Sequence, residues 1–180
     1  VVTACAEMCG GEVERAEVGS SEMVYRPGRR MNGGAYEWDI GTAGSTTMLA
    51  MSLLLVGSFA DKACSFTLKG GLFQDCAPSA HHMRGVLLPL LRKMGLDAEL
   101  SVRKPGYVPE GKGILEVTVK PPKTGLSPLV LPNQGKVIGV KGIALSSHLA
   151  EQEVSDRMAD ECSARLEEAG YDADIEAADP

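Results

Sequence analysis

The apolar residues of this chain follow two periods, and each period predicts a different kind of element. Recurrence at every second residue is typical of a strand, whereas recurrence at every third and fourth residue is typical of a helix. Between residues 36 and 119 the two periods predict the order βαβαββ, with strands at 36–40, 64–68, 98–102 and 114–119 and helices at 44–59 and 79–94. This order predicts the α+β fold class, with helices packed on a sheet.

The two predicted helices and the last strand differ in how they distribute apolar residues. The helix at 44–59 is apolar nearly all round, which predicts burial on most sides. The helix at 79–94 has a single apolar stripe and contains Pro89, whose ring opposes the carbonyl four residues earlier, so we expect a kink there. In the last strand Leu115, Val117 and Val119 share one face, which predicts a sheet with one solvated side.

Segments on either side of this unit also carry element signals. A helix is predicted before Gly10, followed by short strands at 12–17 and 23–25. After a Pro-rich and Gly-containing boundary at 121–125, we expect a strand at 137–145, a helix capped by Ser147, and a strand from residue 171. Five residues are expected to line one face of that helix: Val154, Met158, Cys162, Leu166 and Ala169. Because the pattern opens inside a helix and closes inside a βαβ unit, we interpret the sequence as a fragment.

Composition and charge narrow the function. The chain has 180 residues, 44% of them hydrophobic, which suffices for one ordinary core and a small annex. The longest apolar stretch, residues 48–56, is far below the roughly 20 residues of a membrane span, so no membrane association is expected. The net charge of −6 divides into +3 for residues 1–147 and −9 for residues 148–180. Any site for a polyanion is therefore expected to be local, and broad nucleic-acid binding is disfavoured.

The five cysteines favour a reducing, cytoplasmic location. Their number is odd and they form no CxxC pair, which argues against a disulfide framework. Cys5 and Cys9 have a spacing at which two ligands can share a helix face, but no histidine or second cysteine pair matches it. We therefore expect core roles for them and no metal site.

Two glycine-rich turns are the candidate site. Residues 41–47 and 70–79 each lead from a predicted strand into a predicted helix. Such turns place backbone N–H groups and the positive end of a helix dipole at a sheet edge, where a phosphate can bind. The simpler interpretation, which spacing alone favours, is that the glycines and hydroxyls only cap two helices, since no Walker or dinucleotide fingerprint is present.

Several motifs occur in a fixed order along the chain. Residues 40–46 read IGTAGST, Gly70-Gly71 is followed by Ala77-Pro78, residues 87–95 read LLPLLRKMG and residues 105–113 read PGYVPEGKG. Together they resemble the RNA 3′-terminal phosphate cyclase family, over essentially the whole chain. The resemblance implies βαβαββ repeats similar to the C-terminal domain of translation initiation factor three, plus a small α/β insert domain. Residues 1–30 would end one repeat, 31–125 would form a second, and 126–180 would connect to and begin the insert.

The resemblance also implies an activity. Family enzymes use ATP and a divalent cation, Mg or Mn, to convert an RNA 3′-phosphate into a 2′,3′-cyclic phosphate through a histidine–AMP intermediate. His81, His82 and His148 do not stand in the catalytic histidine motif. We therefore expect no catalytic residue in these 180 residues, and no activity from them alone. RNA 3′ ends and ATP are the expected partners.

The resemblance places a few residues at the family's sites. Pro78 matches a proline that lies against the adenine, and His82 stands where the family commonly has an aromatic residue of the same pocket. Met51 stands where the family usually has a glutamine that contacts the nucleotide, and this departure removes a hydrogen-bonding amide. In addition, Arg26, Arg29 and Arg30 are candidates for binding RNA phosphates, although a solvated basic loop is the simpler interpretation.

Alternatives remain open from the sequence. One is a non-catalytic, cyclase-like RNA-binding protein of ribosome assembly, which Met51 favours slightly. Another is an enolpyruvyl transferase, which shares βαβαββ repeats and a similar glycine-rich helix start. Phe73 either stacks on a base or folds onto the core. A homodimer formed through an open strand edge is a further expectation.

Overall fold

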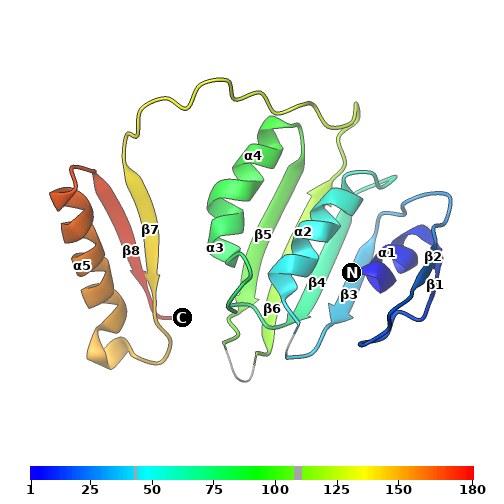
Figure 1. Cartoon of the computed structure of the whole chain (residues 1–180), viewed down its shortest axis with the longest axis horizontal. Coiled ribbons are helices and arrows are strands. Elements are labelled where there is room, and N and C mark those ends of the chain that lie inside the picture. Colours follow the sequence, from blue (N-terminus) through cyan, green and yellow to red (C-terminus); the bar gives the residue numbers. More distant parts are fainter. Residues whose placement is uncertain (43, 108–110) are drawn as a thin grey trace. The chain divides into compact units, whose positions relative to one another are not determined.

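A computed structural model describes residues 1–42, 44–107 and 111–180. Ala43 and residues 108–110, which belong to two of the motifs quoted above, lie outside the described residues. The chain divides into two compact units, Val1–Leu129 and Val130–Pro180 (Figure 1). Each unit is described by itself below.

A mixed four-stranded sheet forms the centre of the first unit. Its strands are β3 (Ala35–Asp39), β4 (Cys64–Gly70), β5 (Asp97–Lys104) and β6 (Gly113–Lys120), in the spatial order β3-β4-β6-β5. β3 and β4 are parallel, and the other two pairs are antiparallel. The carboxyl ends of β3 and β4 therefore meet at one edge of the sheet. The α+β class is confirmed, whereas the relation to the initiation-factor repeat and the boundaries at residues 30 and 125 stay predictions.

Helices cover one face of this sheet, in front of the strands in Figure 1. They are α2 (Thr46–Gly57) and a second helical segment made of α3 (Ala80–His82), η1 (Met83–Leu87) and α4 (Leu88–Lys93). Phe66, Leu115, Val117 and Val119 are fully buried beneath them, while Thr118, on the opposite face, is exposed. The predicted solvated side of the sheet is confirmed.

The second helical segment is irregular just before Pro89. η1 is a π-helical turn, in which the N–H of Leu88 donates to the carbonyl of Met83, five residues earlier. A proline excludes the carbonyl four residues before it, here that of Gly85, and brings no N–H of its own. A wider turn releases that carbonyl without ending the helix. The distortion expected at Pro89 therefore takes the form of a π-turn.

The chain begins with α1 (Val2–Cys9), which ends at Gly10 in the left-handed conformation, with φ +62°. The hairpin β1 (Glu12–Glu14) and β2 (Val24–Arg26) follows and is antiparallel. Ala4 and Met8 of α1 belong to the same hydrophobic core as the central sheet. The predicted helix is confirmed, and it packs as part of the first unit.

The second unit is a βαβ arrangement. Parallel strands β7 (Val140–Leu145) and β8 (Ala173–Ala178) are joined through the short 3-10 helix η2 (Ala150–Gln152) and α5 (Val154–Glu168).

The helix face predicted from the apolar stripe of this unit is only partly correct, because Val154 and Leu166 are half-buried whereas Cys162 and Ala169 are exposed. α5 buries Ser155 and Ala159, while Met158 is 48% exposed. The helix starts after Glu153 and has no side-chain cap, so Ser147 does not cap it. The residues that α5 buries are small, and hydrophobicity alone did not reveal this.

Within residues 1–42, 44–107 and 111–180, no helix is both long and apolar enough to span a bilayer.

Candidate nucleotide and RNA site

Three turns that lie far apart in the sequence meet at one edge of the central sheet. The N–H of Gly71 donates to the carbonyl of Gly44 at 2.8 Å, and the N–H of Phe73 donates to the carbonyl of Gly106 at 3.0 Å. A Cβ placed on Gly111 would lie 3.1 Å from the carbonyl oxygen of Thr42. Because glycine has no Cβ, the backbones of these turns can contact one another directly. The motifs beginning at residues 41, 70 and 105 thus form one connected rim.

The starts of the two helices are capped by side chains. Ser45 Oγ accepts a hydrogen bond from the N–H of Met48 at 3.3 Å, and Ser79 Oγ accepts one from the N–H of His82 at 3.0 Å. Thr46 is fully buried, and both its N–H and its hydroxyl donate to the carbonyl of Gly71 at 2.8 Å. Both donors of Thr46 are therefore used in hydrogen bonds within the rim. Helix capping is therefore confirmed for both serines.

A hollow of about 320 Å³ opens beside the first turn. Asp39, Lys69 and Lys112 are among the residues that line it. The carboxylate of Asp39 accepts a hydrogen bond from the N–H of Gly41 at 2.9 Å. Lys69 is hydrogen-bonded to Glu37, which raises the pKa of the lysine. The hollow therefore carries groups of both charge signs and is not a purely cationic pocket.

Phe73 lies within a stack of aromatic side chains. Its ring centroid is 5.2 Å from that of Tyr107 and 5.6 Å from that of His81, with interplanar angles of 20° and 14°. The side chain also packs against the hydrophobic core. Of the two interpretations of Phe73, the structure shows the one in which it folds onto the protein.

Pro78 and His82 lie within one turn of the start of the second helical segment. Pro78 is half-buried and His82 is exposed. The cap formed by Ser79 holds the backbone between them. The structure thus presents a prolyl ring and an imidazole on neighbouring parts of one helix start, where both are accessible to a ligand.

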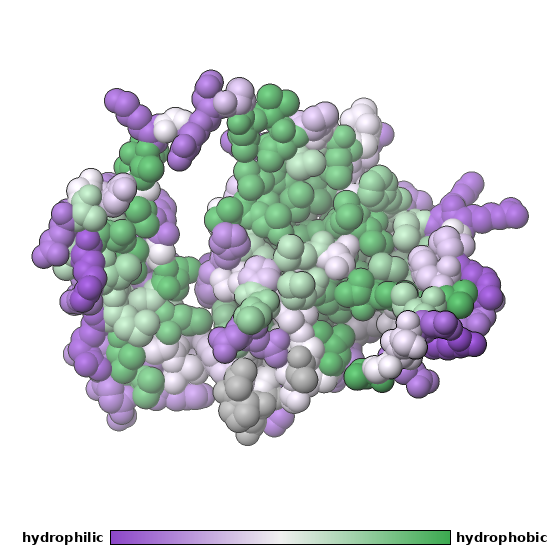
Figure 2. Space-filling view, in the orientation of Figure 1, coloured by the Kyte–Doolittle hydropathy of each residue, from purple (hydrophilic) through white to green (hydrophobic). Residues whose placement is uncertain are grey.

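Met51, the third residue of the expected nucleotide site, lies in apolar surroundings. It is 40% exposed on the outer side of α2 and lines an apolar hollow of about 110 Å³, together with leucines of α2 and of the second helical segment. Residues 40–60 contain no charged side chain. Figure 2 shows hydrophobic atoms gathered where α2 and α4 lie in Figure 1. The burial predicted for most sides of α2 is therefore confirmed, except on one face, where Met48 and Leu55 are also exposed, by 48% and 58%.

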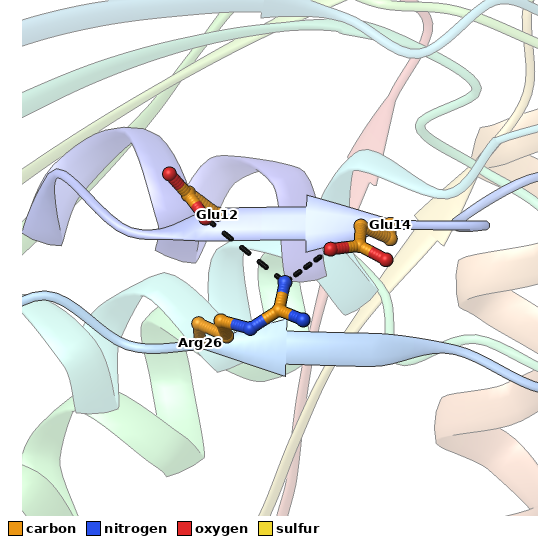
Figure 3. Close-up of polar contacts among 3 residues, drawn as sticks. All are labelled: Glu12, Glu14 and Arg26. Carbon is orange, nitrogen blue, oxygen red and sulfur yellow. Dashed lines mark hydrogen bonds and ion pairs between the residues drawn. The ribbon is translucent and has the colours of Figure 1, made fainter.

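Arg26 is paired with carboxylates, as Figure 3 shows. It lies on β2 directly opposite Glu12 of β1, and its guanidinium contacts Glu14 and, at 4.0 Å, Glu12. These contacts depend on the register of the hairpin, which the sequence did not reveal. Arg29 and Arg30 follow in the loop and are exposed. The three arginines considered together in the sequence are thus in two different electrostatic environments.

The chain matches a known protein family over most of its length. The family model described as RTC, RNA 3'-terminal phosphate cyclase, matches residues 1–165. The chain belongs to this family. The RNA 3′-terminal phosphate cyclase family includes ATP-dependent cyclases, and RNA and ATP are the substrates that membership implies. Membership favours these ligands over those of an enolpyruvyl transferase.

A divalent cation, Mg or Mn, was expected from the resemblance alone and stays a prediction. Within the described residues there is no group of three or more His, Cys, Asp or Glu side chains arranged to hold a metal ion. No step of the proposed chemistry is assigned to the cation.

The loop that follows β2 is anchored by Cys9. The buried Sγ of Cys9 lies 3.3 Å from the Tyr25 hydroxyl and accepts a hydrogen bond from the N–H of Gly28 at 3.3 Å. Burial acts to raise the pKa of the Cys9 thiol, but these hydrogen bonds outweigh burial and lower the pKa overall. The same contact is the main reason that the pKa of Tyr25 is raised to about 12. All five cysteines are free, and the core role expected for Cys9 is confirmed.

Proposed function

We propose that this chain belongs to an ATP-dependent RNA 3′-phosphate cyclase and supplies part of its nucleotide and RNA cleft. The single observation that carries the proposal is the family match over residues 1–165. In the proposed reaction the RNA 3′-phosphate takes AMP from an enzyme histidine, and the neighbouring 2′-hydroxyl then attacks that phosphorus. AMP leaves and the cyclic phosphate remains. Activation of the leaving group and the proximity of the 2′-hydroxyl lower the barrier.

In this proposal the adenine lies against Pro78 and His82. The prolyl ring offers an apolar surface, and the exposed imidazole offers an aromatic face for stacking. The rim of three turns positions this helix start relative to the sheet, because Phe73, which packs beside His81, is bonded through its backbone to Gly106. Arg29 and Arg30 are proposed to contact RNA phosphates.

The nucleotide part of the proposal is tested by equilibrium binding of ATP, with GTP as the control for base recognition. We expect measurable ATP binding that is weakened when Pro78 or His82 is changed. The three histidines of this sequence do not stand in the family's catalytic motif. Incubation of residues 1–180 with ATP labelled in the α-phosphate is therefore expected to leave no covalent adenylate. A labelled protein band would contradict the assignment of catalysis to a histidine outside this sequence.

A second candidate is a non-catalytic, cyclase-like protein that binds RNA during ribosome assembly. Met51 favours it, because this thioether lies in a hollow lined mainly by leucines, where the family usually has an amide. Such a protein would bind single-stranded RNA with an affinity that ATP does not alter, and would not bind ATP itself. Titration of RNA with and without ATP therefore separates the two candidates.

A further inference from the structure

The loop after β2 has a backbone fixed against a second loop, which follows α2. Met31 forms a parallel bridge with Ala60, and the N–H of Asp61 donates to the carbonyl of Met31 at 3.0 Å. The N–H of Gly33 donates to the Asp61 carboxylate at 2.7 Å. On the other side, the N–H of Asn32 donates to the carbonyl of Met8 at 2.8 Å. Side chains of the two loops therefore project from a defined backbone.

Lys62 lies directly on this loop. A Cβ placed on Gly33 would be 2.2 Å from the carbonyl oxygen of Lys62 and 2.6 Å from its Cγ. Gly33 is thus required for the contact, and the aliphatic stem of Lys62 crosses the loop at that residue. Arg30 precedes Gly33 by three residues, which corresponds to about 10 Å of extended chain. The folded chain therefore adds a third cation, distant in sequence, to Arg29 and Arg30.

These three cations differ from Arg26 in their electrostatic environment. Within the described part of the chain, neither Arg29, Arg30 nor Lys62 makes an ion pair or a side-chain hydrogen bond. The neighbouring carboxylate, Asp61, accepts the N–H of Gly33. Arg26, by contrast, faces Glu12 and Glu14. A polyanion that approaches the loop would meet three positive charges that are unpaired among the described residues. To bind Arg26, it would have to compete with the carboxylates of Glu12 and Glu14.

We propose that Arg29, Arg30 and Lys62 form a contact site for the phosphodiester backbone of single-stranded RNA, and that Arg26 is not part of it. The inference rests on the proposed function for the identity of the nucleic acid. Arg30 and Gly33, where Lys62 lies, are at most about 10 Å apart along the chain, a span that suits two or three successive phosphates of an extended strand. Such contacts are independent of base sequence and release counterions, so they appear as salt dependence of the affinity.

The experiment measures that salt dependence. Binding of a fluorescein-labelled, 3′-phosphorylated RNA decamer to residues 1–180 is titrated by fluorescence anisotropy between low and physiological salt. For single strands each phosphate contact contributes about 0.7 to the slope of log K against log salt. Lys62→Gln and Arg29→Gln are each expected to reduce the slope by about 0.7. Arg26→Gln is expected to leave it unchanged, and so is Lys123→Gln, a control at an exposed lysine in the turn after β6.

The outcomes separate this site from the proposed function. An unchanged slope in Lys62→Gln would overturn the site while leaving the ATP-binding test untouched. An equal loss of slope in Arg26→Gln would also overturn it, because the paired arginine would then be a contact. Absence of RNA binding by the parent chain would overturn the site even if ATP binds. Gly33→Ala provides a second test without removing charge, since its added methyl group displaces Lys62, and the slope should fall in this variant as well.

Discussion

The backbones of Gly44 and Gly71 are bonded to each other, the N–H of Gly71 donating to the carbonyl of Gly44 at 2.8 Å. This bond joins two turns that are 27 residues apart and holds the rim of the candidate site together. A side chain at residue 71 cannot be accommodated without moving backbone, because its Cβ would lie 2.9 Å from the same carbonyl oxygen. A Cβ on Gly44 would instead lie 2.7 Å from the carbonyl oxygen of Ile40, so each turn needs glycine for a close backbone approach of its own.

Gly71→Ala is therefore expected to destabilise the first unit by about 1–3 kcal/mol, the usual cost of inserting a group into close-packed surroundings. Urea unfolding followed by circular dichroism measures the change. Gly85→Ala is the matched control, because a Cβ at this helical glycine meets nothing within 4 Å. It should be neutral or stabilise the protein by up to about 1 kcal/mol. Equal destabilisation by both substitutions would show that the rim contact is unimportant.

Tyr25→Phe tests the contact that anchors the loop after β2. Because the pKa of Tyr25 is raised to about 12 in the folded chain, its contribution to stability is complete below the unfolded pKa of about 10 and is lost as the pH rises towards 12. The phenylalanine variant should be less stable than the parent at neutral pH, and the difference should shrink above pH 10. Unfolding curves at several alkaline pH values provide the measurement. A difference that stays constant with pH would argue against the shifted tyrosine.

Met51→Gln tests whether the family's nucleotide contact can be restored. Met51 is partly exposed, so the amide can be accommodated without burying an unpaired polar group. If the adenine site extends to this position, one added hydrogen bond should tighten ATP binding by about 2- to 10-fold, corresponding to 0.5–1.5 kcal/mol. Met48→Gln, one turn earlier on the same exposed face, is the control and should change nothing. Identical effects of the two variants would place the nucleotide elsewhere.

His82→Ala and His82→Phe test the aromatic wall of the proposed adenine site. Loss of the ring should weaken ATP binding by about 5-fold, as expected for a stacking contact near 1 kcal/mol, while phenylalanine should retain the affinity. Isothermal titration calorimetry gives the dissociation constant of ATP for each variant. His81→Ala is the comparison. Because His81 stacks on Phe73 and lies 3.4 Å from Arg84, its loss should lower stability more than it changes affinity. An alanine at residue 82 that binds ATP normally would remove this residue from the site.

Local patterns predicted the elements of the first unit closely. Strand alternation placed β4 and β6, and the αL glycine after Cys9 marked the end of α1. The buried face of β6 was also predicted, because alternation of side chains is a property of a single strand. Predictions were incomplete where the partner surface decides burial. α5 packs through Ser155 and Ala159, and α2 leaves Met48 and Leu55 exposed.

The candidate site shows the same division. The hydroxyls of the two turns were expected to cap helices, and Ser45 and Ser79 do so; a cap is recognisable from sequence because it bonds only to its own helix. The pairing of Arg26 with Glu14 was not, because strand register sets it. Lys62 carried no signal either, since it joins the loop through a contact at Gly33, 29 residues away in the chain.

By itself, then, the sequence determined the order of strands and helices, the caps and the glycine-rich turns, all of which depend on interactions between residues a few positions apart. Only the tertiary structure decided that Gly44 lies on Gly71, that Arg26 is paired and that Lys62 lies against Gly33, in the loop that carries Arg29 and Arg30. The physical reason is the distance along the chain over which each interaction acts. Periodicity and capping are local, whereas charge pairing and close backbone approach depend on which distant segments the folded core brings together.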